Sequence, residues 1–146
     1  YNFEITNEQL RHVLLKNPEN RSYDDLLVLK GFILKTEFML KSLAGIVNPK
    51  QMNDLCRGLG METYSDGDVV FNQGDIGDKV FILMEGSVDL RVRYKIDLTQ
   101  GESEIREKFI KTYTERGSYF GERALQFDEP RSGTVIASSI TSLITV

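Results

Sequence analysis

The sequence has a single cysteine, a single histidine and no tryptophan among its 146 residues. One cysteine, Cys56, excludes an internal disulfide, which fits a reducing compartment and leads us to expect a cytoplasmic protein. A lone histidine, His12, excludes paired histidine metal ligands, and we find neither a Ser/His/Asp set nor a G-x-x-x-x-G-K-S/T phosphate loop. The sequence therefore predicts no enzymatic activity and no metal site within these residues.

Long apolar runs and long basic runs are missing as well. No apolar stretch approaches the ~18 residues that a membrane span requires. No run of five or more Lys or Arg residues occurs, and 18 basic against 22 acidic residues give a formal net charge of −4. Because a nucleic-acid backbone is recognised mainly by clustered positive charge, we expect no nucleic-acid partner, and we expect no membrane span in this segment.

The first part of the chain has the features of helices. Capping-box patterns at Thr6 and Ser22 mark two helix starts, and Asn48 before a proline marks a third. After the second start, apolar residues continue at helical spacing through Leu26, Leu29, Phe32, Ile33, Met39, Leu40 and Leu43. We interpret residues 1–60 as a helical leader.

After Gly60 the apolar period changes to two, which is typical of strands. In the best example, alternate residues are expected to point inward: Val88, Leu90, Val92 and Tyr94. Further strand candidates, separated by turn-forming segments, are 68–71, 79–84, 109–113, 134–138 and 142–146. Residues 96–107 are polar and predict a long exposed loop between two strands. Many short strands with regular turns indicate a closed barrel or a jelly roll.

The most informative stretch is FGERALQFDEPRSGTVIA, residues 120–137. A short helical turn opening at Gly121 would expose backbone N–H groups that attract phosphate, and Arg131 supplies a planar fork that suits two phosphate oxygens. The carboxylate of Glu122 would repel phosphate, but it could accept a hydrogen bond from a neighbouring ribose hydroxyl. The alternative is a surface ion pair between Glu122 and Arg131, worth at most ~1 kcal/mol.

These residues resemble the phosphate-binding cassette of cyclic-nucleotide-binding domains, the regulatory modules of cAMP- and cGMP-dependent protein kinases and of cyclic-nucleotide-gated channels. The family pattern is roughly F-G-E-x-A-L followed by P-R-x-x-T-V-x-A. The chain matches it at Phe120, Gly121, Glu122, Ala124, Leu125, Pro130, Arg131, Thr134, Val135 and Ala137. Residues 66–90 are similar to the family's early strands. The resemblance covers about residues 37–146.

The resemblance implies an α+β fold, with N-terminal helices followed by an eight-stranded β-jelly roll over residues 61–146 and a cassette at 120–135. It also implies roles: Glu122 would bind the ribose 2′-hydroxyl, and Arg131 the exocyclic oxygens of the cyclic phosphate. Backbone N–H groups of Ala124 and Ser132 would help to hold the phosphate. The nucleotide-binding residues expected from the resemblance are Gly121, Glu122, Arg123, Ala124, Arg131, Ser132 and Gly133. The expected ligand is cGMP or cAMP, without a further cofactor.

The chain departs from the family pattern in three places. Ser132 stands where cAMP-selective members often have Ala and cGMP-selective members Thr; its hydroxyl favours cGMP. Gly133 stands where Ala is common, and we expect it to loosen the backbone. The helices that follow the last strand in the family and cap the base are missing after Val146. We therefore interpret the chain as part of a longer protein and predict weaker affinity and poorer base selectivity than in the intact protein.

The sequence thus predicts a regulatory module that senses a cyclic nucleotide and controls an attached or associated effector, such as a protein kinase catalytic domain. The alternative is a degenerate module of the same fold that acts as a scaffold and binds no nucleotide.

Overall fold

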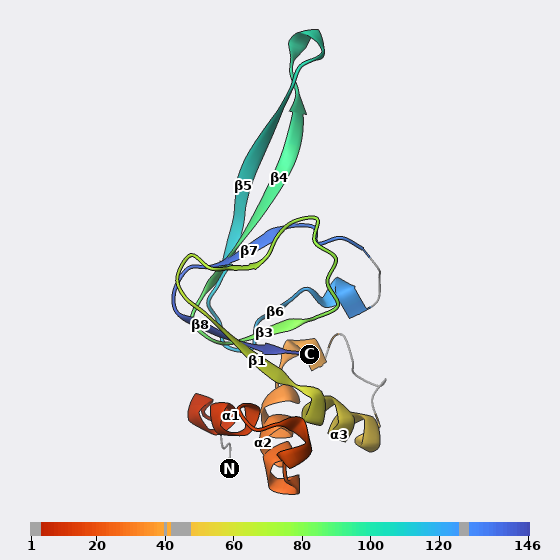
Figure 1. Cartoon of the computed structure of the whole chain (residues 1–146), viewed down its shortest axis with the longest axis vertical. Coiled ribbons are helices and arrows are strands. Elements are labelled where there is room, and N and C mark those ends of the chain that lie inside the picture. Colours follow the sequence, from red (N-terminus) through yellow and green to blue (C-terminus); the bar gives the residue numbers. More distant parts are fainter. Residues whose placement is uncertain (1–3, 40, 42–47, 126–128) are drawn as a thin grey trace.

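Helices precede strands along the chain, as Figure 1 shows. The computed structural model describes residues 4–39, 41, 48–125 and 129–146. The α-helices are α1 (Asn7–Leu14), α2 (Tyr23–Ile33) and α3 (Pro49–Gly58). The strands are β1 (Gly60–Tyr64), β2 (Val69–Phe71), β3 (Phe81–Glu85), β4 (Val88–Asp97), β5 (Ser103–Tyr113), β6 (Tyr119–Phe120), β7 (Thr134–Ala137) and β8 (Thr141–Thr145). The predicted α+β fold, helices first and an eight-stranded roll after them, is confirmed.

Each α-helix begins where a start signal predicts it. The side chains of Thr6, Ser22 and Asn48 each accept a hydrogen bond from the backbone N–H three residues later. The side chain at that third residue reaches back to the cap, so both bonds of a capping box are present at all three helix starts. These bonds satisfy N–H groups that have no partner within the helix.

The apolar stripe after Ser22 does not form one continuous helix. Helix α2 ends at Ile33, although the stripe predicts helix as far as Leu43. The hydroxyl of Thr36 donates to the Ile33 carbonyl at 2.7 Å and accepts from the Met39 backbone N–H at 3.4 Å. Thr36 therefore closes one turn and opens the next, a competition with the helical ladder that the apolar spacing does not reveal. Leu40 and Leu43 lie outside the described residues.

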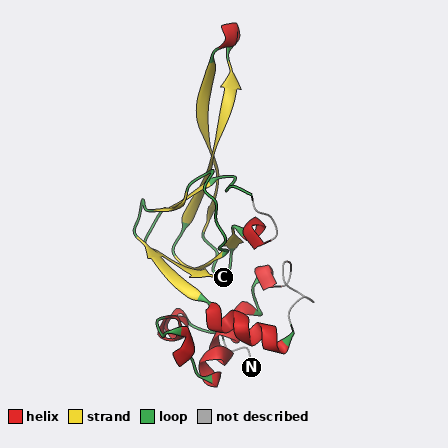
Figure 2. Ribbon diagram, turned by 45° about the vertical axis from the view of Figure 1, so that its right-hand side comes forward, coloured by secondary structure: helices red, strands yellow, loops and turns green. Residues whose placement is uncertain are grey.

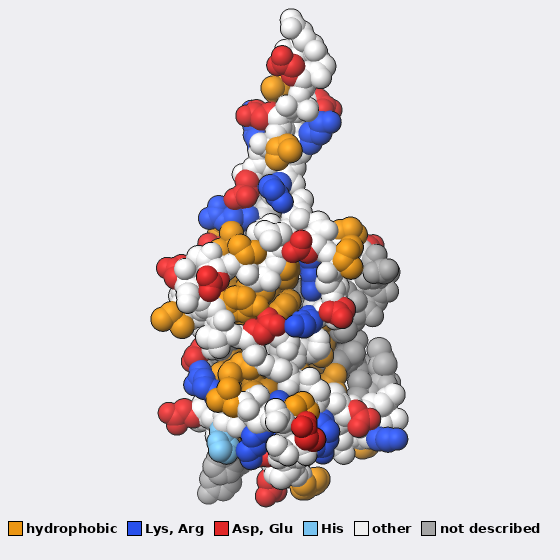
Figure 3. All heavy atoms as spheres, in the orientation of Figure 1, with side chains coloured by type: hydrophobic (Ala, Val, Ile, Leu, Met, Phe, Trp, Pro, Cys, Tyr) orange, Lys and Arg blue, Asp and Glu red, His pale blue; other side chains and the backbone are white. Residues whose placement is uncertain are grey.

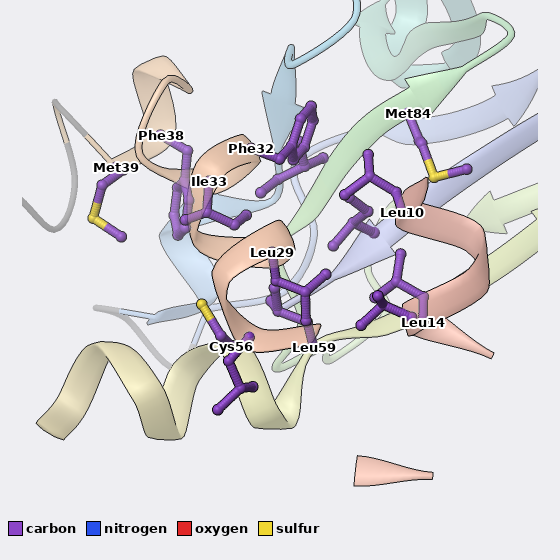
Figure 4. Close-up of a cluster of buried hydrophobic side chains, with 14 of the residues drawn as sticks. Leu10, Leu14, Leu29, Phe32, Ile33, Phe38, Met39, Cys56, Leu59 and Met84 are labelled. Carbon is purple, nitrogen blue, oxygen red and sulfur yellow. The ribbon is translucent and has the colours of Figure 1, made fainter. Parts of the chain in front are cut away.

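The strands form two four-stranded antiparallel sheets, in the orders β1-β8-β3-β6 and β2-β7-β4-β5. The first sheet separates two apolar clusters. Ile82, Met84 and Ile144 pack with the helices, whereas Phe81, Leu83 and Leu143 pack inside the roll. Figure 4 shows Met84 beside Leu10 in the helical cluster. Burial on both faces explains why the sequence of β3 is continuously apolar rather than alternating.

The prediction of a loop at residues 96–107 is wrong. Strands β4 and β5 continue through most of this segment, paired from Val88 with Tyr113 to Asp97 with Ser103, and a 3₁₀ turn η3 (Thr99–Gly101) joins them. Figures 1 and 2 show the resulting hairpin projecting away from the roll, and Figure 3 shows charged side chains of both signs along it. The outer part of the hairpin, residues 96–107, has no core beside it and therefore shows no period-two signal.

Two further details differ from expectation for related reasons. Tyr94, which the alternation predicts to point inward, is 43% exposed because it lies on the projecting part of β4. Strands β1 and β6 are missing from the predicted set. The first begins at Gly60, where we ended the helical leader, and the second has only the residues Tyr119–Phe120. No helix in the described residues is long and apolar enough to cross a membrane.

Candidate functional site

A cleft of about 210 Å³ lies where β6 leads toward β7. Its apolar wall consists of Phe71, Leu90, Tyr113, Phe120 and Val135. Its polar rim consists of Gly121, Glu122, Arg123, Glu129, Pro130, Arg131, Ser132 and Gly133. Ala124 lies within the 3₁₀ turn η4 (Glu122–Leu125) that forms part of this rim. The structure thus brings the predicted site residues to one place.

Gly121 lets the chain turn sharply from β6 into η4. Its φ of +81° lies in the left-handed region, where a Cβ is disfavoured. A Cβ at this position would also lie 2.7 Å from Nη1 of Arg131 and 3.2 Å from the Lys79 carbonyl oxygen. Both the backbone conformation and the close approach of Arg131 therefore require glycine here.

Arg131 is held at the base of the cleft by contacts with distant parts of the chain. Its backbone N–H donates to the Asp75 carbonyl at 2.7 Å, and its own carbonyl accepts from the Gly74 N–H at 2.8 Å. The side chain is only 8% exposed. Nη1 donates to the Gly121 carbonyl at 3.2 Å, and Nη2 donates to the Lys79 carbonyl at 2.8 Å. The guanidinium is therefore bonded both to the cassette, at Gly121, and to the segment just before β3, at Lys79.

Aromatic rings complete the surroundings of the guanidinium. Its central carbon lies 4.4 Å from the ring centroid of Phe71 and 5.9 Å from that of Phe81, which are cation–π distances. Gly77 closes the other side so tightly that a Cβ there would lie 2.5 Å from Nη2. The packing leaves the guanidinium little freedom to move.

The electrostatics of Arg131 favour an anionic ligand. Burial lowers the pKa of the guanidinium, and the nearby carboxylates of Asp78 and Asp75 partly oppose that effect. An arginine still keeps its charge at neutral pH. Its buried Nε–H has no acceptor among the described residues. A buried charge with an unused donor carries a desolvation cost, which a further hydrogen bond to an anion would reduce.

Glu122 and Arg123 lie exposed on the rim. The surface ion pair between Glu122 and Arg131 is not formed in the described structure; instead, Arg123 pairs with Glu129, with Nη2 and Oε2 3.0 Å apart. Burial raises the pKa of Tyr113, and the carboxylate of Glu122 adds to the rise. The Glu122 carboxylate is therefore available to a ligand.

Ser132 and Gly133 end the rim in different environments. Ser132 is exposed, so its hydroxyl can reach a ligand. Gly133 is buried, and a Cβ there would lie 2.8 Å from Cδ1 of Leu90 and 3.1 Å from the Arg91 carbonyl oxygen. Glycine at this position thus lets the cassette pack closely against β4.

Sequence reasoning missed the apolar wall and the carbonyl partners of Arg131. Phe120 links the wall together: its ring centroid lies 5.5 Å from that of Tyr113 and 6.1 Å from that of Phe71. Tyr113 packs against the core of the roll and also lines the cleft. A strand pattern predicts burial for such residues, but it does not indicate which of them face a cleft.

The comparison with protein families decides the identity of the module. The model of the cyclic nucleotide-binding domain matches residues 61–146. This chain belongs to the cyclic-nucleotide-binding domain family. Members of the family that resemble it include a cGMP-dependent protein kinase of Plasmodium berghei, 33% identical over 105 residues, or 72% of this chain and 11% of that protein. A cAMP-dependent protein kinase regulatory subunit of Blastocladiella emersonii is 34% identical over 65% of this chain and 21% of its own length.

Solved structures of the same fold agree with this assignment. The regulatory domain of Toxoplasma gondii protein kinase A with cAMP superposes with a TM-score of 0.63 and 24% identity, covering 83% of this chain and 41% of that one. The regulatory subunit of a cAMP-independent protein kinase A from Trypanosoma brucei has a TM-score of 0.64 and 20% identity, covering 93% of this chain and 43% of that one. The chain therefore spans well under half of each of these related proteins.

Proposed function

We propose that this chain is a sensory module that binds a cyclic nucleotide in the cleft and transmits its occupancy to an attached or associated effector, such as a protein kinase catalytic domain. The observation that carries the proposal is Arg131. This residue is 8% exposed, borders the cleft and has an Nε–H without an acceptor among the described residues. The names of relatives, which are cGMP- and cAMP-dependent protein kinases, support it.

Each part of a cyclic nucleotide has a matching group on the cleft. The cyclic phosphate would approach Arg131 and the backbone N–H groups at the start of η4, where the helical turn presents unsatisfied donors. The exposed Glu122 carboxylate would accept a hydrogen bond from the ribose 2′-hydroxyl. The apolar wall offers a surface for the sugar and the base. Ser132 would select between bases, and its hydroxyl favours cGMP, which has an exocyclic amino group to meet it.

Calorimetric titration with cAMP and with cGMP tests the proposal. Arg131→Lys keeps the positive charge but loses the planar fork, and we expect it to weaken binding about tenfold or more, because a hydrogen bond to a charged group is worth roughly 1.5–3 kcal/mol. The same substitution at Arg106, which pairs with Glu104 on the projecting hairpin, serves as the control and should leave affinity unchanged. Glu122→Gln provides a second test at an exposed position, where folding is not at risk.

A scaffold that binds no nucleotide is the second candidate, and one observation favours it. Both Nη atoms of Arg131 already donate to backbone carbonyls, so the side chain also serves to hold β3 and the cassette together. The Trypanosoma brucei structure of the same fold is described as the regulatory subunit of a cAMP-independent protein kinase A. A folded wild-type chain that gives no heat with either nucleotide, even at high nucleotide concentration, would favour the scaffold over the sensor.

A further inference from the structure

Arg116 makes several polar contacts between the roll and the start of α1, in addition to the apolar contacts that join the helices to the first sheet. Its Nε donates to Oδ1 of Asn7 at 2.9 Å, its Nη2 donates to the Ile5 carbonyl, and its Nη1 lies 3.5 Å from a carboxylate oxygen of Glu4. Its guanidinium carbon lies 4.7 Å from the ring centroid of Phe32 in α2. Arg116 thus connects the turn at residues 115–118 with the start of α1 and with α2.

The interface around Arg116 is incompletely filled. A cavity of about 290 Å³ lies between the end of α2 and this turn, and its walls include Gly31, Phe32, Thr36, Arg116 and Gly117. Atoms that line a cavity have fewer packing partners than atoms in a filled core. The polar contacts of Arg116 therefore join the helices to the roll at a place where apolar packing is incomplete.

Strand β6 connects this attachment with the nucleotide cleft. Leu83 of β3 fixes the preceding turn: its carbonyl accepts from the Gly117 N–H at 2.8 Å, and its N–H donates to the Ser118 carbonyl at 2.7 Å. Tyr119 then faces the helices, with its ring centroid 5.5 Å from that of Phe38. Phe120 faces the roll and lines the cleft, because successive strand residues point to opposite sides.

The next residue, Gly121, completes the route. Its carbonyl accepts a hydrogen bond from Arg131 at 3.2 Å. A shift of the 115–118 turn would therefore move Tyr119, Phe120 and then the acceptor that fixes the guanidinium.

We infer that Arg116 is a positioning residue for the nucleotide site, an inference that rests on the function proposed above. By holding α1 and α2 against the 115–118 turn, it keeps β6 and Gly121 where Arg131 is pre-organised for a phosphate. The docked helices thus raise nucleotide affinity. Because coupling between two sites is reciprocal, a bound nucleotide strengthens the docking of the helices by the same factor.

The test compares Arg116→Met with Arg11→Met. Methionine keeps an apolar chain against Phe32 but removes the polar contacts of Arg116. Arg11 is a matched control, because it also ties α1 to the roll, through Glu85 at the end of β3, but it lies away from β6. We expect Arg116→Met to raise the Kd for the better-bound of cAMP and cGMP about threefold to tenfold, and Arg11→Met to change it less than about twofold.

A second readout separates positioning from simple destabilisation. In the wild-type chain, saturating nucleotide should slow hydrogen exchange of the α1 and α2 amides, and this slowing should diminish in Arg116→Met. Arg116→Lys, which keeps a cation over Phe32, should give an intermediate Kd. If thermal unfolding shows that Arg116→Met does not fold, Arg116→Lys replaces it as the test. A Kd of Arg116→Lys equal to that of the wild type would then overturn the inference.

The outcomes distinguish the two proposals. One outcome is that the wild type and Arg116→Met bind the nucleotide with equal Kd, although the α1 amides exchange faster in the variant. That result would overturn the role of Arg116 and leave the proposed sensor intact. An equal loss of affinity in Arg11→Met would also overturn it, because attachment alone would then explain the effect. A wild-type chain that binds neither nucleotide would overturn the proposed function itself.

Discussion

Replacing Gly121 by alanine tests the placement of Arg131 directly. Alanine in the left-handed region costs roughly 1–2 kcal/mol on its own. Its Cβ would lie 2.7 Å from Nη1 of Arg131, so the guanidinium must move and lose at least its bond to the Gly121 carbonyl. A hydrogen bond to a charged group contributes roughly 1.5–3 kcal/mol. The two costs add to about 2.5–5 kcal/mol of unfolding free energy.

Equilibrium unfolding in urea measures this cost, and Gly67→Ala is its control. Gly67 has a φ of +89°, but nothing lies within 4 Å of where its Cβ would be. It should therefore show the backbone strain alone, roughly 1–2 kcal/mol. With an m value of roughly 2 kcal/mol/M, the midpoint should fall by about 1–2.5 M for Gly121→Ala and by less than about 1 M for Gly67→Ala.

A double-mutant cycle with Arg131→Ala isolates the contact. If the guanidinium is the obstacle, Gly121→Ala in the Arg131→Ala background should cost no more than Gly67→Ala does in the wild type. Equal costs of the two single glycine substitutions would refute the close approach of Arg131 to Gly121, and with it the argument that the cassette is built around this side chain.

Two other predictions concern packing and pH. Gly133→Ala should destabilise the fold by about 1–3 kcal/mol in urea unfolding, because its Cβ would press on Leu90 and on the Arg91 carbonyl. Gly58→Ala, where nothing lies within 4 Å, should cost nothing, and an equal cost at both sites would contradict the packing argument. Hydrogen bonds from the Lys16 side chain and the Ser22 backbone hold the pKa of Asp25 below its usual 3.8. The carboxylate of Asp25 therefore stabilises the fold above pH 3.8, and this stabilisation is lost as the pH falls through the lower pKa that Asp25 has in the folded state. Asp25→Asn should therefore lower the urea midpoint more at neutral pH than at pH about 2; the same loss at both would contradict this assignment.

Local signals in the sequence predicted the features that local chemistry decides. A cap residue and the side chain three positions later set each helix start, so the starts at Thr6, Ser22 and Asn48 were predictable. The end of α2 was not, because Thr36 closes it with a side-chain bond that competes with helix spacing. The outer part of the β4–β5 hairpin, residues 96–107, was missed for the opposite reason: paired strands exposed on both faces need no apolar pattern, only backbone pairing.

The candidate site divides in the same way. Residue type and spacing were enough to single out Gly121, Glu122 and Arg131. The surroundings of Arg131 were not predictable, because its acceptor on Lys79 is a backbone carbonyl, which every residue has. The tight fit at Gly77 likewise depends on an antiparallel contact between segments far apart in the sequence, the Ile76–Pro130 bridge, which no pattern along either segment reveals.

The segment leading into β3 explains how one short stretch of chain serves both the cleft and the helices. The Lys79 carbonyl accepts from Arg131, Val80 is fully buried in the cluster with the helices, and Phe81 packs inside the roll beneath the guanidinium. These consecutive residues face different partners because strand side chains alternate while the backbone stays between them. In the proposed sensor, a displacement of Arg131 on ligand binding would therefore reach the helices through a single buried residue, Val80. The proposed coupling would then need no long pathway, because the segment before β3 and the edge strand β6 both lie between the cleft and the helices.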